Sequence, residues 1–141
     1  MTDLIALSES HFEAVAEKNI DRILNFYADA PELLVFVEGP RWATRSFENV
    51  SRGWVDFVGS AISVKSCRWV EIIESRTFAD SGFVAGIVEM IAEIGGNLKT
   101  IRFRGTFVFQ KEADENWRVI HEHFSQPAED PYGIGDWLKT E

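Results

Sequence analysis

The sequence predicts a single α+β domain, in which helices near the start of the chain cover one face of an antiparallel sheet. Apolar residues recur at helical intervals up to about residue 58, and from Ile62 onward the period becomes two-fold. With 141 residues and a hydrophobic fraction of 45%, the chain has enough apolar surface for one sizeable core. We expect residues 1–127 to form the domain and residues 128–141 to form a C-terminal tail.

Two helices are predicted at the start of the chain. Ser10 and Glu13 have the spacing of a capping box, and apolar residues follow at helical intervals: Phe12, Val15, Ala16, Ile20, Ile23, Leu24 and Tyr27. Asn19 is a suitable N-cap, so it should divide this stretch into a longer helix and a shorter one that ends near Pro31.

A short strand and a third helix should come next. The nearly continuous apolar run 33–37 ends at Glu38-Gly39-Pro40, which is typical of a buried strand followed by a turn. After a polar loop, helical spacing returns at Phe47, Val50, Trp54, Phe57 and Val58. We expect this helix to place Trp54 and Phe57 against the core or a pocket.

The remaining chain reads as a strand meander. Residues 62–74 alternate between two faces, and 83–94 and 98–110 flank a Gly95-Gly96 turn of the kind that supplies positive φ angles. A two-residue loop there pairs Met90 with Ile101, Val88 with Phe103, Gly86 with Gly105 and Val84 with Phe107 on an apolar face. The opposite face then pairs Glu89 with Arg102. The last strand should run from Trp117 to Ser125.

Composition limits the possible partners and location. The net charge is -9 and the chain has no cluster of Lys and Arg, so neither nucleic acid nor an anionic membrane surface is an expected partner. The single cysteine, Cys67, cannot form an intramolecular disulfide, and no stretch is apolar enough for a membrane span or signal peptide. We therefore expect a cytoplasmic protein.

The faces of the last strand decide which residues are available for chemistry. Strict alternation puts Ile120, Glu122 and Phe124 on one side. The same alternation puts Trp117, Val119, His121 and His123 on the other side.

Several segments together resemble the SnoaL-like, or nuclear transport factor 2-like (NTF2-like), superfamily. They are Ala28-Asp29 after a helix ending in tyrosine, Gly39-Pro40, the Trp54 helix, and the closing run from Trp117 to Pro127. That run, W-x-[apolar]-x-H-x-H-x-S-x-P, resembles most closely the members that are similar to the association domain of calmodulin-dependent kinase II. The resemblance extends from about residue 8 to residue 127.

The resemblance implies a cone-shaped, cystatin-like fold, in which a strongly curved sheet wraps the helices around a deep pocket. It also implies a homodimer formed through the outer sheet face. The superfamily includes ketosteroid isomerases, polyketide cyclases, dehydratases and epoxide hydrolases, as well as members that only bind or oligomerise, so fold alone does not define function. The isomerase-type aspartate has no match in 33–37, and the isomerases' helix-1 tyrosine falls near His11 or Phe12, which disfavours steroid isomerase chemistry.

Glu122 is the first candidate for a catalytic residue, and His11 is its possible assistant. By the resemblance, Glu122 faces the pocket among apolar groups, where desolvation would raise its pKa as acid–base chemistry near neutral pH requires. The alternative, which the cost of burying an unpaired carboxylate favours, is that Glu122 pairs with His11, Tyr27 or Arg68 and only fixes the core. We expect no cofactor.

The expected ligand is a small hydrophobic molecule held by an inner set of mostly aromatic residues. That set is Tyr27, Phe36, Trp42, Trp54, Phe57, Trp69, Met90, Phe103, Phe107 and Phe124, with Trp42 as the preferred gate. More than half of these residues would be expected in any well-packed core. A non-catalytic binding or oligomerisation module therefore remains the alternative function.

The outer sheet face is the expected dimer interface. It should carry Arg102, Arg104, His121 and His123, and a solvated ladder of salt bridges is the simplest alternative for its arginines. His121 and His123, with Glu89 or Glu93, could also imitate a metal site, but spacing fixes no third ligand, so we expect no metal. The sequence does not determine whether the tail, with Tyr132 and Trp137, folds over the pocket or over a partner subunit.

Overall fold

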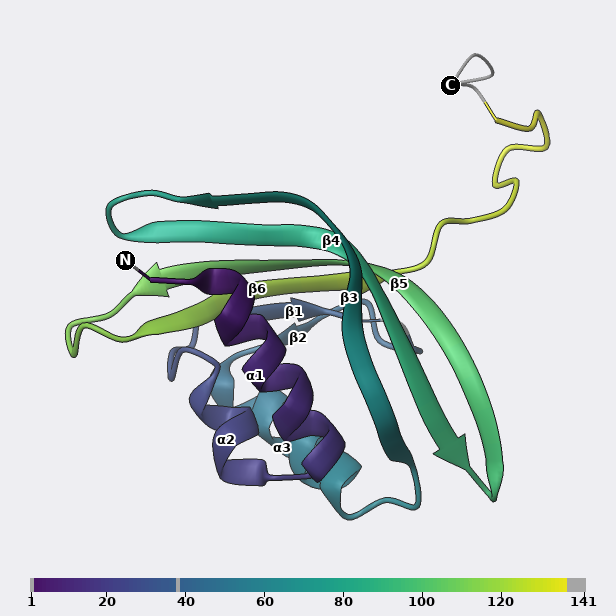
Figure 1. The fold of residues 1–141 in the computed structure, drawn as a ribbon, viewed down its shortest axis with the longest axis horizontal. Helices are drawn as coiled ribbons and strands as arrows, with labels where there is room; N and C mark the ends of the chain where they lie inside the picture. The colour runs from purple at the N-terminus through teal and green to yellow at the C-terminus, as the bar shows by residue number, and fades with distance from the viewer. Residues whose placement is uncertain (1, 38, 137–141) are drawn as a thin grey trace.

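The protein is described by a computed structural model that covers residues 2–37 and 39–136. Across these residues the chain forms three helices and six strands (Figure 1). Their bounds are α1 (Leu4–Glu17), α2 (Ile20–Asn25), β1 (Leu34–Phe36), β2 (Thr44–Arg45), α3 (Phe47–Val58), β3 (Ser63–Thr77), β4 (Ser81–Ile94), β5 (Asn97–Lys111) and β6 (Trp117–Ser125). The expected turn residue Glu38 and the tail residue Trp137 lie outside the described ranges.

The strands form one strongly curved, unclosed sheet, and the helices lie in its hollow (Figure 1). The strand order is β2-β1-β6-β5-β4-β3. The four long strands form the expected antiparallel meander, whereas β1 pairs with β6 in parallel. The predicted α+β cone is therefore confirmed, with the last strand of the chain lying inside the sheet, where both of its edges are paired.

The helix boundaries follow from their capping residues, and the first one differs from the prediction. α1 begins at Leu4, six residues before the predicted capping box, because the Asp3 side chain accepts a hydrogen bond from the Ala6 amide. Ser10 consequently lies inside the helix. Asn19 caps α2 as predicted, by accepting from the Arg22 amide.

The β4–β5 hairpin has the predicted register. Val88 pairs with Phe103 and Glu89 with Arg102, and the four apolar pairs expected from the turn are all present. Gly95 and Gly96 form the two-residue loop with φ angles of 58° and 81°, which glycine adopts without strain. The side-chain period and the turn chemistry were thus sufficient to define this hairpin.

Strands β3 and β6 depart from strict alternation because they contain β-bulges. The β3 ladder is interrupted between Val64 and Ser66, between Trp69 and Glu71, and between Ile72 and Glu74. In β6, His121 pairs with Val108 and Val119 pairs with Phe109, so Ile120 is the extra residue. Each extra residue reverses the faces of those that follow. Val119 and Glu122 therefore point to the same side, and the prediction that Val119 faces outward was wrong.

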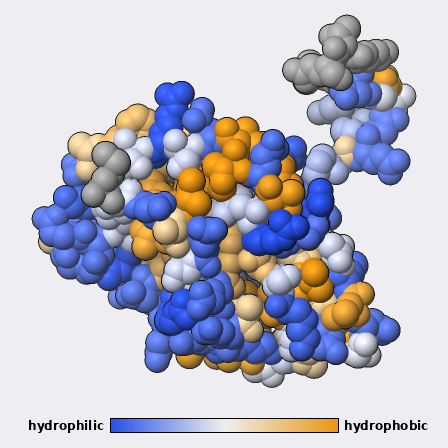
Figure 2. Space-filling model, in the orientation of Figure 1, coloured by the Kyte–Doolittle hydropathy of each residue, from blue (hydrophilic) through white to orange (hydrophobic). Residues whose placement is uncertain are grey.

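The core lies between the helices and the concave face of the sheet. Ile23, Leu33, Val84, Val88, Phe109 and Val119 have no exposed surface, and Phe107 and Tyr27 are 1% exposed. None of the helices in the described residues has the length and apolar character needed to traverse a membrane. Figure 2 shows that hydrophobic residues also reach the surface across the middle of this face of the molecule, between groups of hydrophilic residues.

Candidate functional site

Glu122 and Tyr27 form a buried polar pair at the centre of the hollow. The bulge at Ile120 turns Glu122 inward, where it lies opposite Phe107 on β5 and is 4% exposed. Tyr27 follows α2, and its hydroxyl donates a 2.7 Å hydrogen bond to Oε1 of Glu122. The carboxylate that sequence analysis expected in an apolar setting is therefore enclosed, and Tyr27 is one of its three expected partners.

The Tyr27 hydroxyl also interacts with two further side chains of this cluster. Trp54 on α3 hydrogen-bonds to it, and Nε2 of His11 on α1 lies 3.4 Å from it. Burial, followed by the negative charge of Glu122, raises the pKa of Tyr27 well above its ordinary value of 10. Tyr27 consequently stays protonated and acts as a hydrogen-bond donor at physiological pH.

His11 is held among aromatic rings. It stacks on Phe26 with ring centroids 3.9 Å apart, and it meets the rings of Tyr27, Trp54 and Phe107 edge-on. Burial lowers its pKa from 6.5 to about 3, so the imidazole is neutral at physiological pH. Its Nδ1 is buried without a hydrogen-bond partner in the described part of the chain.

Ser8 is a buried polar residue that the sequence analysis missed. Its hydroxyl has no exposed surface, accepts a 2.7 Å hydrogen bond from Nε1 of Trp69 and donates one to the carbonyl of Ile5. Ser8 lies four residues after Leu4 and three before His11, on the buried face of α1. Had the predicted helix begun at Leu4, this spacing would have placed Ser8 on its buried face.

Most of the predicted inner set comes together around Glu122 and Tyr27. Ring contacts or packing against the core join Trp54, Phe57, Trp69, Met90, Phe103, Phe107 and Phe124. Three further rings in this group were missed, namely Phe12, Phe26 and Phe109. Phe124, Phe57 and Met90 are partly exposed, so parts of the apolar wall reach the surface.

Phe36 and Trp42 do not join this group. The Phe36 ring contacts the rings of His121 and His123, which lie on the face opposite Glu122. Val35 points into the core in its place, because neighbouring residues of a strand alternate. Trp42 lies in the loop between β1 and β2 and is 97% exposed, so the structure does not place it over the aromatic wall as a gate.

Cys67 lies on the β3 side of the same hollow. It is of intermediate exposure and packs against the core. Burial, together with the charge of Glu122, raises its pKa from 9.0 to about 12. The thiol is therefore protonated and a poor nucleophile.

The outer face of the sheet carries a cross-strand charge cluster. Glu89 on β4 accepts from Arg68 on β3 and from Arg102 on β5, at 3.2 and 3.0 Å. Arg104 donates instead to Ser125, and His121 bonds to the Leu34 carbonyl through Nδ1. Among the described residues, no group of three or more His, Cys, Asp or Glu side chains is arranged to hold a metal ion.

The curved sheet and the helices enclosed in its hollow define an NTF2-like fold. The SnoaL-like domain family matches residues 5–129, so the chain belongs to this family. A search of curated proteins gives no significant match to the chain.

Solved structures of the same fold agree with this assignment. A calcium/calmodulin-dependent protein kinase II association-domain protein from Xanthomonas campestris is 22% identical and has a TM-score of 0.75, with 89% of this chain and 86% of that chain covered. An NTF2-like superfamily protein from Salmonella enterica is 15% identical with a TM-score of 0.77, and 94% of each chain is covered. A ketosteroid isomerase-like protein from Erwinia carotovora atroseptica is 17% identical with a TM-score of 0.70, with 86% of this chain and 93% of that chain covered.

Proposed function

We propose that the protein is a cofactor-free acid–base enzyme that acts on a small hydrophobic molecule, with Glu122 as the group that takes up and returns a proton. The observation that carries this proposal is the 2.7 Å hydrogen bond from Tyr27 to a carboxylate that is 4% exposed among aromatic rings. A carboxylate held in one orientation in apolar surroundings is suited to proton transfer from carbon.

The substrate would lie against the partly exposed part of the apolar wall. Phe124, Met90 and Phe57 supply contacts to an uncharged ring or chain. Glu122 would take a proton from a carbon next to a carbonyl group and return it to the same or a neighbouring carbon. Tyr27 orients the carboxylate, and His11 acts through Tyr27 as a positioning residue.

The test is hydrogen–deuterium exchange of a planar ring ketone, 2-indanone, in D₂O, followed by proton NMR. Wild-type protein should accelerate exchange at the carbons beside the carbonyl, and the Glu122→Gln variant should be slower by at least about 100-fold. Glu129→Gln is the matched control, because Glu129 is exposed and lies beyond the sheet. Equal rates for wild type and Glu122→Gln would contradict a catalytic role for Glu122.

A non-catalytic binding module is the second candidate function. It is favoured by the tight enclosure of the central pair, since Tyr27 and Phe107 are 1% exposed. In that case Glu122 fixes the core, and ligands raise the melting temperature of wild type and Glu122→Gln equally without any exchange. The two candidates are thus separated by turnover rather than by binding.

We also propose that the protein is a homodimer formed through the outer sheet face. Ile87 and Ile91 alternate with Glu89 on this face and are half-buried, next to Arg102 and Arg104 on β5. An apolar centre with charged neighbours is the usual arrangement of a protein interface.

A further inference from the structure

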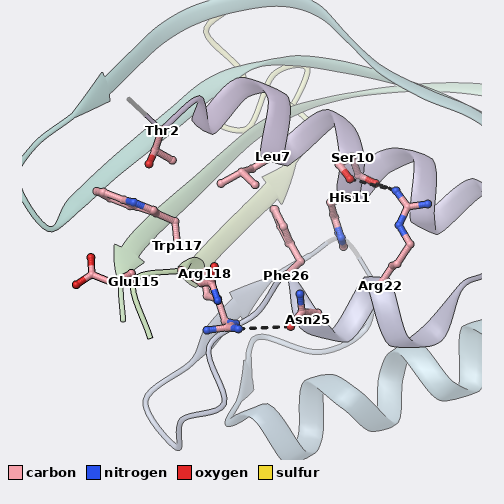
Figure 3. A pocket seen from close by; sticks show the side chains of 11 residues that line it. Thr2, Leu7, Ser10, His11, Arg22, Asn25, Phe26, Glu115, Trp117 and Arg118 are labelled. Atoms are coloured by element: carbon pink, nitrogen blue, oxygen red, sulfur yellow. Dashed lines mark hydrogen bonds between the residues drawn. The ribbon is translucent and has the colours of Figure 1, made fainter. Parts of the chain in front are cut away.

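A cavity lies on the side of the molecule formed by α1, α2 and the turn between β5 and β6. Its volume is about 400 Å³, within the usual range for sites that bind small molecules. Figure 3 shows its wall running from Trp117 through Leu7 and Phe26 to His11, with Arg22 beyond His11 and Arg118 below. Glu122 and Tyr27 do not line it.

His11 gives this cavity an unused hydrogen-bond acceptor. The Tyr27 hydroxyl gives its proton to Glu122, so Nε2 of His11, at 3.4 Å, faces the Tyr27 oxygen as a donor. A neutral imidazole that is protonated on Nε2 carries a lone pair on Nδ1. That lone pair is buried without a partner among the described residues, in a side chain that lines the cavity.

The charges in the wall are already paired. Arg22 bonds to Glu17 at 3.0 Å and to the Ser10 hydroxyl at 3.1 Å. Arg118 forms ion pairs of 2.9 Å with Glu112 and Asp114. Since both guanidinium groups are neutralised and the whole chain carries a charge of -9, the cavity does not favour an anion.

We propose that this cavity binds a small neutral molecule with a planar apolar body and an O–H or N–H group of the phenol or azole type, donated to Nδ1 of His11. The rings of Phe26 and Trp117 and the Leu7 side chain contact the apolar body. Nδ1 has almost no surface of its own, so this binding requires a small movement of the Phe26 side chain, which stacks on the His11 ring. The bound donor then satisfies a buried acceptor that otherwise lacks a partner.

The test is a titration of ¹⁵N-labelled protein with phenol, monitored through the ring nitrogens of histidine. The chain has three histidines, so His121 and His123 serve as internal controls. Phenol should shift the Nδ1 signal of His11 saturably and leave those of His121 and His123 unchanged. Anisole, which has the same ring and no donor, should bind at least about tenfold more weakly. Benzoate should not compete with phenol.

Two variants make the test specific. His11→Phe keeps a stacked ring and removes the lone pair, so it should weaken phenol binding about tenfold and leave anisole binding unchanged. Leu7→Trp fills the cavity and should abolish binding of both, whereas Leu98→Trp, at an exposed position on the β4–β5 hairpin, should not.

Three results would overturn the proposal: no saturable shift of His11, equal binding of phenol and anisole, or tighter binding of benzoate. Should His11→Phe not fold, the comparison of phenol with anisole and the Leu7→Trp variant still decide the question. Glu122→Gln should retain phenol binding, because Glu122 does not line the cavity. A failure of phenol to bind is therefore distinct from a failure of the catalysis proposed for Glu122.

Discussion

The Tyr27 hydroxyl lies 2.7 Å from Oε1 of Glu122, although 95 positions separate the two residues in the chain. The contact joins the end of α2 to β6, and the backbone of these segments is joined as well, because the amide of Val119 donates to the carbonyl of Phe26. The pair therefore fixes the helical layer onto the sheet.

The first prediction concerns this pair. Tyr27→Phe removes the donor to a buried carboxylate and should lower the free energy of unfolding by about 2 kcal/mol. Urea denaturation monitored by tryptophan fluorescence measures this change. Tyr132→Phe, at a position that is 71% exposed, should change the free energy by less than about 0.5 kcal/mol. A loss of similar size in both variants would show that the Tyr27 hydroxyl has no special role.

The second prediction is a pH dependence caused by His11. Its pKa falls from 6.5 in the unfolded chain to about 3 in the folded protein, so below about pH 6.5 the unfolded state takes up a proton that the folded state does not. Stability is therefore lost from about pH 6.5 downward. Between pH 8 and pH 5, wild type should lose about 2 kcal/mol more than His11→Phe, which lacks this group. Parallel stability curves for the two proteins would contradict the buried, neutral state of His11.

The third prediction uses three glycines. A Cβ on Gly86 would collide with the Glu71 carbonyl, which belongs to the backbone, so Gly86→Ala should cost about 3 kcal/mol. A Cβ on Gly105 would lie 2.9 Å from the Phe124 ring. Because the Phe124 side chain is partly exposed and can move, Gly105→Ala should lower the free energy of unfolding by only about 1 kcal/mol. Gly53→Ala, in the middle of α3 with open space around it, should stabilise by about 0.5–1 kcal/mol. Thermal and urea unfolding give the order of the three variants.

The fourth prediction concerns the single thiol. Cys67 should react slowly with iodoacetamide at pH 8, because its pKa is about 12 in the folded protein. Removing the nearby charge in Glu122→Gln lowers that pKa, so alkylation should become several-fold faster. Mass spectrometry of timed samples measures the rate, and Glu71→Gln on the same strand is the control. An unchanged rate in Glu122→Gln would mean that the carboxylate and the thiol do not interact.

The fifth prediction is the oligomeric state. Native mass spectrometry of wild type should give a dimer, and Ile87→Asp should give a monomer, because it places a charge at the apolar centre of the outer face. Ile94→Asp, at the exposed end of the hairpin, should remain a dimer. A monomeric wild type would refute the proposed interface.

The sequence was sufficient to predict the elements in which local signals and the apolar pattern agree. The β4–β5 register follows from Gly95-Gly96 and from alternation, and α2 begins at Asn19 because an asparagine cap precedes the helical pattern. The inward position of Glu122 followed from the family resemblance, and the structure places it inward.

The differences between prediction and structure arise from bulges and from tertiary contacts. The extra residues Lys65, Val70, Ile73 and Ile120 are ordinary strand residues, so the sequence gives no local sign that they interrupt the ladder. Ser8 was missed because a capping-box pattern at Ser10 suggested a later start for α1. The position of Phe36 depends on the parallel pairing of β1 with β6, which joins segments that are far apart in the chain.

The bulge at Ile120 also affects how this chain is compared with its relatives. If an alignment gives Ile120 no gap against a relative without the bulge, inward-facing residues on one side of Ile120 are matched with outward-facing ones. The role of Glu122 would then be assigned to a neighbouring histidine. Relatives that lack the insertion should therefore be aligned with a one-residue gap in the last strand. The presence or absence of that single residue then becomes a simple marker for sorting members of the family by what they present to their interior.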